Sequence, residues 1–577
     1  MKNLIVLLSL INILTSLSQD IIPDEYKPYL YATDEDIQWF KDAKFGVFVH
    51  WGPVTLARVP LSWGRHGERP FAGKKATSGV PADEYDNLYK RFNPMKFEAE
   101  KWIRNAKEGG AKYFIFTAKH HDGFCNWDTK TNKYNIMNSP FGRDVCKELA
   151  DACHKYGIKL FWYYSQPDWH HPDCGTENHE RYKEYMFEHI RELLTNYGKV
   201  DGIFFDGLGS KASDWDTHKL LKMARELQPG IIINSRGGGW SDPEMKKGDY
   251  DNPELEFGKF QLDRPWEMCA TICNIWSYVG GELVKPHGTC IRMLVQCAGS
   301  GGNLALNNGP QEDGAMVEGE KNVYLEMGEW LNKYGESIYN TTGGPYKPGV
   351  WGASTRSGNN IYLHVLQTWG INSKPIIELP LPGAKIKDIT SLNAKIKSYE
   401  FDDNKLIIEF DEESLDDIDN IVKIEIKGDA SKLPVIETEN LVSVGSNAKG
   451  LASSQSSEER GVRVLFGEDA LQFQEGIKRK IAWEPDYNDT TPWIMAEFEE
   501  PVAISAISLV EHMRNVKIRE FNIEYFDGVT WYKLYEGKNP GLDFGLKFET
   551  VNAKKVKVNI LKTDWGAPNI VKFDLYN

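Results

Sequence analysis

The chain has 577 residues and a mass of 65.7 kDa, so we expect one large domain followed by one or two smaller ones. Its hydrophobic content of 41% is that of a globular protein. A formal charge of −15 argues against nucleic acid as the main partner, because binding to a phosphate backbone depends on clustered Lys and Arg.

The first 18 residues have the pattern of a secretory signal peptide. Lys2 supplies a basic start, an apolar run over 4–14 is too short to span a bilayer, and small polar residues follow. We therefore expect residues 1–18 to be removed and the mature protein to be periplasmic or extracellular. No later run is long enough to cross a membrane, so no membrane partner is predicted. Export permits disulfides, but the spacing of the eight cysteines specifies neither a pairing nor a structural zinc site.

Residues 19–340 form the predicted first domain. Apolar runs alternate there with amphipathic stretches, which is typical of a parallel (β/α)₈ TIM-like barrel. The strand-like runs are 45–50, 113–117, 158–164, 201–205 and 231–234, with weaker ones around Trp266 and at 303–306. Helix signals lie between them, including a capping Asn93 before Pro94 and apolar residues at three and four spacing over 147–155 and 180–196.

Polar and aromatic residues follow directly after several of these strands. They lie in the segments 50–52, 119–122, 163–166 and 205–206, and a parallel barrel gathers such strand ends on one face. The most informative stretch is Asp201-Gly-Ile-Phe-Phe-Asp206, an apolar run that ends in a carboxylate and is followed by glycine. Asp206 is therefore either a reactive group or a cap for the next helix.

Two all-β domains are predicted after the barrel. Short alternating runs at 360–365, 406–410 and 422–426 indicate a β-sandwich over 341–435. A Ser/Gly-rich passage at 443–447 then leads into a second all-β unit over 436–577, with strand-like runs at 493–498, 504–509 and 521–525.

Asp206 suggests hydrolysis of a glycosidic bond with retention, which requires two carboxyl groups about 5 to 5.5 Å apart. The downstream candidates for the second carboxyl are Glu254, Glu256, Glu267 and Glu282. Glu267 has the most distinctive context, because the neighbouring Trp266 is able to raise its pKa by desolvation, as a general acid requires. A structural ion pair is the alternative role for Glu267.

Six motifs, taken in order, resemble the α-L-fucosidases of glycoside hydrolase family 29. They are Phe48-Val-His50-Trp-Gly52, Thr117-Ala-Lys-His120-His121-Asp122-Gly-Phe124, Tyr163-Tyr164-Ser165, Phe205-Asp206-Gly207, Trp266-Glu267-Met268 and Gly301-Gly-Asn303-Leu-Ala-Leu-Asn-Asn-Gly-Pro310. The resemblance covers roughly residues 30 to 435. It implies a retaining exo-glycosidase that removes terminal α-L-fucosyl residues from oligo- or polysaccharides without a cofactor and without a catalytic metal.

By this resemblance Asp206 is the nucleophile and Glu267 the acid/base, with Glu254 and Glu256 as alternatives because the acid/base position varies within the family. The residues expected to bind the sugar are His50, Trp63, His120, His121, Tyr164 and Phe204.

Two positions that shape the sugar pocket depart from the family pattern. Ser62 precedes Trp63 where the family often has Glu, and Phe204 stands where it often has Trp. L-Galactosides or other fucose-like sugars are therefore an alternative substrate class, and a non-catalytic glycan-binding protein is an alternative function. A basic cluster with Arg65, Arg69, Lys74 and Lys75 is either a solvated loop or a site for a sulfated glycan.

The last unit, with Thr491-Pro-Trp493 and the terminal run 570–576, resembles discoidin-like (F5/8 type C) carbohydrate-binding modules. The resemblance implies that this unit either binds sugar or braces the barrel. Folds of this kind are able to hold a structural calcium, whose ligands the sequence does not identify.

Overall fold

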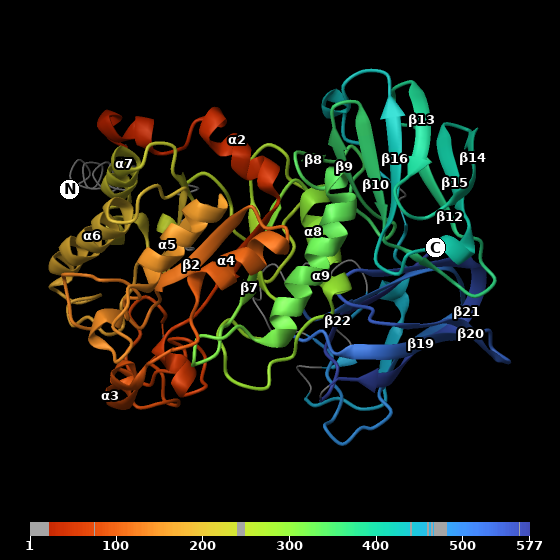
Figure 1. The fold of residues 1–577 in the computed structure, drawn as a ribbon. Coiled ribbons are helices and arrows are strands. Elements are labelled where there is room, and N and C mark those ends of the chain that lie inside the picture. The colour runs from red at the N-terminus through yellow and green to blue at the C-terminus, as the bar shows by residue number, and fades with distance from the viewer. Residues whose placement is uncertain are drawn as a thin grey trace, which may run out of the picture.

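A computed structural model describes residues 22–73, 75–238, 248–438, 441–457, 461–462, 465–466, 482–564 and 566–577. The expected signal peptide, residues 1–18, lies outside the described residues. Figure 1 shows a large α/β domain on one side of the molecule and two β-rich domains on the other, with α8 and α9 between them.

Seven parallel strands form the sheet of the first domain, in the spatial order β5-β4-β3-β2-β1-β7-β6. They are β1 (Phe45–Val49), β2 (Tyr113–Lys119), β3 (Lys159–Ser165), β4 (Gly202–Asp206), β5 (Ile232–Ile233), β6 (Glu267–Thr271) and β7 (Asn303–Asn308). Nearly every residue of these strands is buried, as expected for parallel strands that are covered on both faces.

Segment 249–255 joins the two edges of this sheet. On one side the Ser235 N–H donates to the Tyr250 carbonyl at 3.0 Å, and on the other the Leu255 N–H donates to the Cys269 carbonyl at 3.0 Å. Parallel bridges on both sides accompany these bonds. The parallel sheet therefore closes on itself, with this segment acting as an eighth strand. It lacks an apolar run, which is why the sequence did not predict it.

Helices surround the closed sheet. The longer ones are α2 (Asp34–Ala43), α4 (Ala99–Glu108), α5 (Val145–Tyr156), α6 (His179–Thr195), α7 (Thr217–Leu227), α8 (His287–Gly299) and α9 (Glu318–Tyr334), and α3 (Ala82–Tyr85) is a single turn. Local chemistry sets their ends: the Asp144 side chain accepts from the Lys147 N–H at 2.9 Å before α5, and Gly157 ends that helix at φ 70°. Side chains inside the barrel form one apolar cluster, and those between sheet and helices form another.

The second domain packs a five-stranded antiparallel sheet against a three-stranded one around its own apolar core. Its strands are β8 (Thr342–Gly343), β9 (Gly352–Ser357), β10 (Asn360–Val365), β12 (Ile376–Pro380), β13 (Ile386–Ser391), β14 (Ile396–Asp402), β15 (Lys405–Phe410) and β16 (Asn420–Ile426). The strands predicted at 360–365, 406–410 and 422–426 correspond to β10, β15 and β16.

The third domain is antiparallel except at one edge. Its strands are β17 (Lys449–Ala452), β18 (Trp493–Glu511), β19 (Ile518–Phe526), β20 (Trp531–Lys538), β21 (Phe544–Thr563) and β22 (Ile570–Tyr576). Register shifts interrupt the pairing of the two longest strands, β18 and β21. The exception is β11 (Thr368–Trp369), which leaves the second domain and pairs in parallel with β21.

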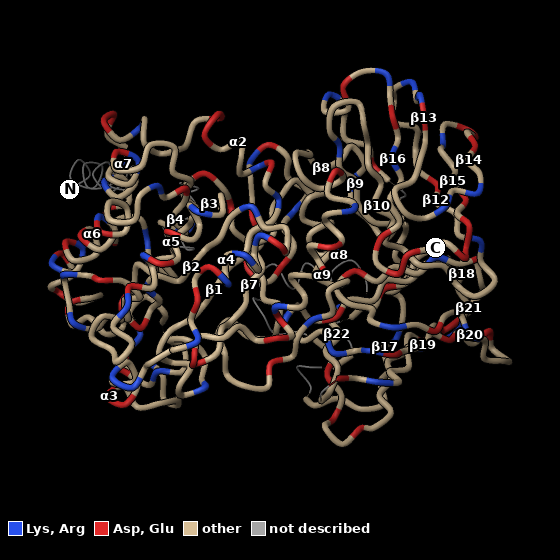
Figure 2. The backbone as a smooth tube through the Cα atoms, in the orientation of Figure 1, with Lys and Arg blue, Asp and Glu red and all other residues tan. Residues whose placement is uncertain are grey.

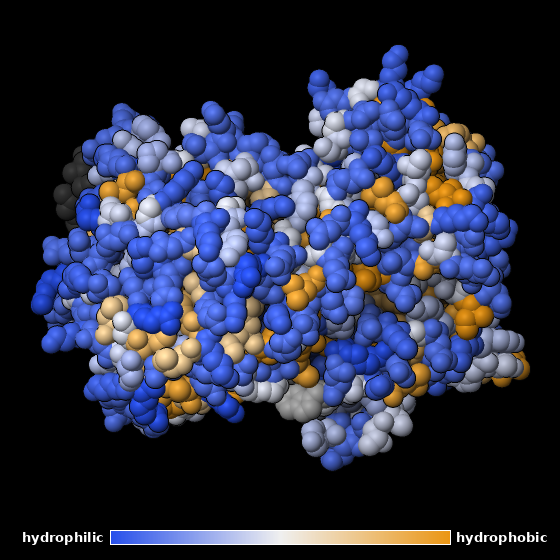
Figure 3. Space-filling model, in the orientation of Figure 1, coloured by the Kyte–Doolittle hydropathy of each residue, from blue (hydrophilic) through white to orange (hydrophobic). Residues whose placement is uncertain are grey.

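The surface carries charges of both signs. Figure 2 shows Lys and Arg interleaved with Asp and Glu along all three domains, and the visible face in Figure 3 is mostly hydrophilic with scattered apolar side chains. Within the part of the chain that the structure describes, none of the helices combines the length and apolarity of a membrane span.

Candidate active site

A cavity of about 950 Å³ opens at the carboxyl ends of the barrel strands. Its lining includes His50, Trp63, His120, His121, Tyr163, Phe204, Asp206, Arg236, Glu254, Trp276 and Arg514. Six of the eight residues predicted to act in catalysis or sugar binding are among them, and the exceptions are Tyr164 and Glu267.

Asp206 is the last residue of β4 and is 8% exposed, on the cavity side. Its Oδ2 accepts a hydrogen bond from the Tyr163 hydroxyl at 2.9 Å and lies 3.8 Å from His121 Nε2. Its Oδ1 lies 3.8 Å from Arg236 Nη1. The carboxylate is thus fixed in orientation by a hydroxyl and a cation while it still faces the cavity.

Glu254 brings a second carboxylate to the cavity, on the segment that closes the barrel. The same Arg236 Nη1 that faces Asp206 lies 3.2 Å from Glu254 Oε2. Arg236 Nη2 also donates to the Asn252 carbonyl at 3.0 Å. One buried guanidinium therefore holds both carboxylates near each other.

Hydrogen bonds on their far side set the tautomers of the pocket histidines. The Asn307 amide NH₂ donates to the Trp276 carbonyl at 2.7 Å, so its oxygen faces His50 Nδ1, 2.6 Å away. His50 Nδ1 must therefore carry the proton, which leaves Nε2 as an acceptor. Burial lowers the pKa of His50 to about 4, so the ring is neutral at pH 7.

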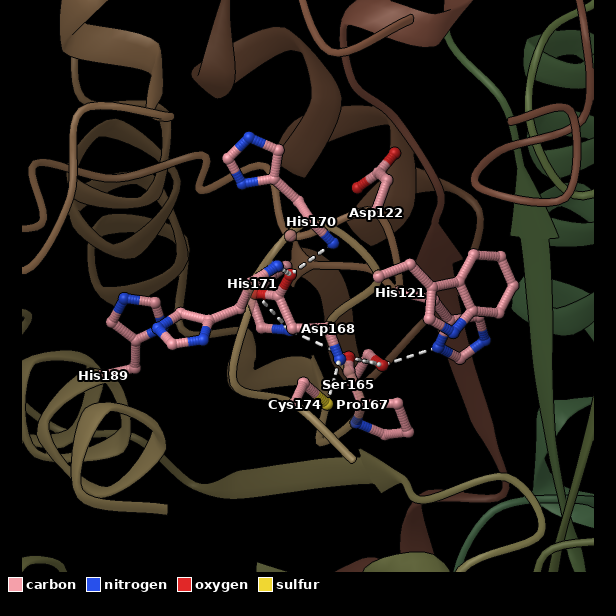
Figure 4. A network of polar contacts seen from close by, with 12 residues as sticks. His121, Asp122, Ser165, Pro167, Asp168, His170, His171, Cys174 and His189 are labelled. Carbon is pink, nitrogen blue, oxygen red and sulfur yellow. Dashed lines mark hydrogen bonds and ion pairs between the residues drawn. The ribbon is translucent and has the colours of Figure 1, made fainter. Parts of the chain in front are cut away.

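A hydrogen bond to Ser165 gives His121 the same tautomer as His50. The Ser165 hydroxyl donates to the Pro167 carbonyl at 2.8 Å, so it accepts from His121 Nδ1 at 2.5 Å (Figure 4). Burial holds the pKa of His121 well below its ordinary value, and its Nε2 is then an acceptor beside Asp206.

His120 has the opposite tautomer. The Ser62 hydroxyl oxygen accepts from the Asp122 N–H at 2.9 Å, and among the described residues His120 Nδ1, 2.5 Å away, is the one acceptor for the hydroxyl proton. Burial and the neighbouring His121 hold the pKa of His120 well below its ordinary value. His120 therefore presents an Nε2–H donor, and the three histidines together offer one donor and two acceptors.

A buried network supports the loop that follows Ser165, the last residue of β3. Asp168 Oδ1 accepts from the main-chain N–H groups of His170 and His171 at 2.9 and 2.8 Å (Figure 4). Lys119 Nζ lies 3.6 Å from the other Asp168 oxygen and donates to the Pro167 carbonyl at 3.1 Å. The His170 and His171 rings pack on Tyr134 and Tyr185 and do not line the cavity.

Aromatic side chains supply the apolar walls. Phe204 is buried and packs 5.6 Å from the Tyr163 ring. Trp63 is 43% exposed at the mouth, edge-on to His121 at 5.8 Å. Trp276, which sequence reasoning missed, packs 4.9 Å from the His50 ring. No apolar run or motif marked it.

The structure places Tyr164 outside the barrel interior. Its hydroxyl lies 3.0 Å from His189 Nδ1 on α6, whereas the preceding Tyr163 contacts Asp206. Successive side chains of a strand point to opposite faces, so only one residue of this pair can face the cavity. The sequence did not settle which one.

Glu267 is also away from the cavity. It is the first residue of β6, pairs with the first residue of β7, and is 0% exposed. Its Oε2 accepts from the Tyr113 hydroxyl at 2.6 Å and its Oε1 from the Asn252 amide at 3.2 Å. Four residue steps of about 3.3 Å separate it from the carboxyl end of its strand, so it does not reach a substrate in this cavity. The sequence predicted a strand here, but the residue lies at its opposite end.

The remaining candidate carboxylates do not line the cavity either. Glu256 is exposed, and Glu282 Oε1 accepts from the Val279 and Gly280 N–H groups, both at 2.7 Å. Glu254 is thus the predicted alternative that the structure brings beside Asp206.

Three of the four residues of the basic cluster lie in the described part of the chain, and each has a partner there. Arg65 makes two hydrogen bonds of 2.7 Å to the Asp86 carboxylate and is buried. Arg69 stacks over Trp63, and Lys75 pairs with Glu68 at 2.8 Å. The fourth basic residue of the cluster, at position 74, lies outside the described residues.

All eight cysteines are free and buried. Across the described ranges, no group of three or more His, Cys, Asp or Glu side chains has the arrangement of a metal site.

Comparison with known proteins identifies the family. The sequence profile of the Alpha-L-fucosidase family matches residues 14–336. Tissue alpha-L-fucosidase of Bos taurus is 31% identical over 321 residues, which cover 52% of this chain and 68% of the relative. The Homo sapiens enzyme is 29% identical over 380 residues, covering 60% and 79%.

Solved structures agree. Alpha-L-fucosidase isoenzyme 1 from Paenibacillus thiaminolyticus is 31% identical, with a TM-score of 0.59 over 68% of this chain and 99% of that one. A Bacteroides thetaiotaomicron alpha-L-fucosidase trapped as a covalent intermediate is 28% identical, with a TM-score of 0.58 over 69% and 97%. The fold of the Vibrio sp. strain EJY3 enzyme, 19% identical, extends over 96% of this chain and 99% of its own, with a TM-score of 0.63. The chain therefore belongs to the α-L-fucosidases of glycoside hydrolase family 29, and is a glycoside hydrolase.

Proposed function

We propose that this protein is an exported, retaining exo-α-L-fucosidase in which Asp206 is the nucleophile and Glu254 the acid/base. The observation that carries this assignment is the position of Arg236, whose Nη1 lies within 4 Å of both carboxylates. Retention requires a separation of about 5 to 5.5 Å between the two carboxyls, whereas inversion requires a larger one that leaves room for a water. Two carboxyls held this closely therefore suit retention. Glu254 takes the role that the sequence assigned to Glu267.

The reaction proceeds in two displacements. Asp206 attacks the anomeric carbon and the glycosidic C–O bond breaks, while the departing oxygen takes the proton of Glu254. Water then attacks the anomeric carbon of the glycosyl-enzyme and gives its proton to Glu254. The bond to Asp206 breaks with this step, and both carboxyls return to their starting states. The Tyr163 hydroxyl and Arg236 stabilise the charge that returns to Asp206.

The sugar is recognised by the three neutral histidines. His50 and His121 accept hydrogen bonds from ring hydroxyls through Nε2, and His120 donates one. Phe204 and Trp276 provide an apolar wall for the methyl group of a 6-deoxy sugar. An apolar wall rejects an added hydroxyl poorly, so L-galactosides are the substrates to test beside fucosides.

Export, the substrate and the C-terminal domain belong to the proposal as well. The apolar N-terminal run supports secretion to the periplasm or beyond. Family membership supports a fucose-containing glycan as the substrate. A sulfated form of that glycan stays part of the proposal, with Arg69 rather than Arg65 as its cation, because Asp86 already pairs with Arg65. The antiparallel third domain is compatible with a discoidin-like module, in which a glycan or a structural calcium would bind.

Azide rescue tests the two carboxylate roles. Asp206→Ala should hydrolyse an aryl α-L-fucoside far more slowly than the wild type, and azide should restore turnover with β-fucosyl azide as the product. Glu254→Ala should give the α-azide, because azide then attacks the glycosyl-enzyme from the opposite side. A β-azide from the Glu254 variant, or no rescue of either variant, would contradict the assignment.

A further inference from the structure

The C-terminal domain contributes a side chain to the catalytic cavity. Arg514 lies in the loop between β18 and β19 and lines the cavity together with Asp206, Arg236 and Glu254. Its Nη2 is 3.9 Å from Glu254 Oε1, and 32% of its side chain is exposed. A residue of the third domain therefore reaches a carboxylate of the first.

A buried carboxylate fixes the base of this loop. Glu511, the last residue of β18, is 1% exposed. Its Oε1 accepts from the Lys517 and Ile518 N–H groups at 2.7 and 2.9 Å, and its Oε2 from the Gly541 N–H at 3.3 Å. These bonds tie the two ends of the Arg514 loop to a neighbouring turn.

The same loop is docked on the barrel. Val516 and Leu542 belong to the apolar cluster that lies between the barrel sheet and its helices. Beside them, the Gln296 amide on α8 donates to Asp543 Oδ2 at 3.3 Å, and Arg292 pairs with the other oxygen at 3.6 Å. Figure 1 shows the blue strands of the third domain close to α8 and α9. The backbone that carries Arg514 is thus held against the catalytic domain.

Glu254 lies between two guanidinium groups. Arg236 faces its Oε2 at 3.2 Å, and Arg514 faces its Oε1. As the carboxyl gives its proton to the departing oxygen, negative charge develops on it, and nearby cations stabilise that charge. Arg236 also lies 3.8 Å from Asp206, whereas Arg514 approaches the other oxygen of Glu254.

We propose that Arg514 is a positioning residue for Glu254, so that the C-terminal domain completes the catalytic site. The inference rests on the proposed acid/base role of Glu254. Arg514 holds the carboxyl in the orientation that delivers its proton, and its loss should matter most where the leaving group needs that proton.

Leaving-group dependence tests this role. Two substrates suffice: 2,4-dinitrophenyl α-L-fucoside, whose leaving group departs without a proton, and phenyl α-L-fucoside, whose leaving group requires one. In Arg514→Met, kcat/KM for the phenyl fucoside should fall about tenfold, or about 1.4 kcal/mol, and that for the dinitrophenyl fucoside less than about threefold. Arg514→Lys should restore part of the loss. Lys533→Ala, which removes an exposed charge from β20, is the control and should leave both values unchanged. Equal losses on both substrates would overturn the proposal.

A double-mutant cycle separates this inference from the proposed function. If Arg514 acts through Glu254, then Arg514→Met should cost less than about twofold in a Glu254→Gln background. A further tenfold loss there would overturn the role of Arg514 while the role of Glu254 stands. Full activity of Glu254→Gln on the phenyl fucoside would instead refute the acid/base assignment, and the inference with it.

Discussion

The substitution Glu267→Gln separates a structural role from a catalytic role for the most deeply buried of the candidate carboxyls. Glu267 is 0% exposed, and burial raises its pKa from the ordinary 4.5 to about 8. Gln has the shape of the protonated side chain and retains an oxygen for the Tyr113 hydroxyl. We expect kcat/KM for an aryl fucoside to stay within about threefold of wild type, since the substitution leaves the cavity lining unchanged.

The stability effect follows from the raised pKa. The folded state keeps the Glu267 proton up to about pH 8, whereas the unfolded chain releases it above about 4.5. The stabilisation is therefore fully present below pH 4.5 and is lost as the pH rises toward 8, at about 1.4 kcal/mol per pH unit. Between pH 5 and 7.5 wild type should lose about 3 kcal/mol through this group, and the Gln variant none.

Thermal denaturation of both proteins at pH 5 and at pH 7.5 measures this difference. The fall in Tm between the two pH values should be smaller in Glu267→Gln by about 3 to 6 °C. Comparing the falls in Tm of the two proteins removes the contributions of the other titrating groups and any pH-independent effect of the substitution. Equal falls in Tm would refute the argument from burial. A loss of activity beyond about a hundredfold in Glu267→Gln would show that Glu267 acts in catalysis.

Three further predictions concern the pocket. Tyr163→Phe should lower kcat/KM by about 10- to 100-fold through loss of a hydrogen bond to a charged group, while Tyr164→Phe leaves it within about threefold; similar losses would contradict the assignment of strand faces. Ser165→Ala frees the His121 tautomer and should lower kcat/KM about fivefold, with circular dichroism to confirm an intact fold, and an unchanged rate would refute the tautomer argument. Burial depresses the pKa of His50 to about 4, so the stability of the wild type should fall as the pH drops from 6.5 toward 4. His50→Gln should show a smaller fall in Tm over that range, and equal falls in the two proteins would contradict the burial of a neutral His50.

Much of the barrel could be predicted from the sequence, because its buried parallel strands are continuous apolar runs. The expected strands at 45–50, 113–117 and 201–205 match β1, β2 and β4 closely. Asp206 was predicted at a strand end for the same reason. Segment 249–255 was missed, since Tyr250-Asp-Asn-Pro-Glu lacks such a run and pairs through tertiary contacts.

The site was less predictable than the fold. The alternation of side chains along β3 requires knowledge of which face is inward, so Tyr163 and Tyr164 could not be ranked from sequence. The neighbouring Trp266 singled out Glu267 but gave no indication of which strand end it occupies. Arg236 and Arg514 carry no local signal, because only the folded chain brings them to Glu254.

Because β11 pairs with β21, the third domain cannot be removed without breaking hydrogen bonds to the second. The Thr368 hydroxyl donates to the Gly545 carbonyl at 2.9 Å, and the Gly370 N–H donates to the Lys547 carbonyl at 2.8 Å. A cut near residue 436 would expose the polar backbone of an unpaired two-residue strand and remove its neighbour. The last domain is thus not a detachable accessory. Fusing this domain to another barrel would require the new partner to supply a strand that pairs with β21.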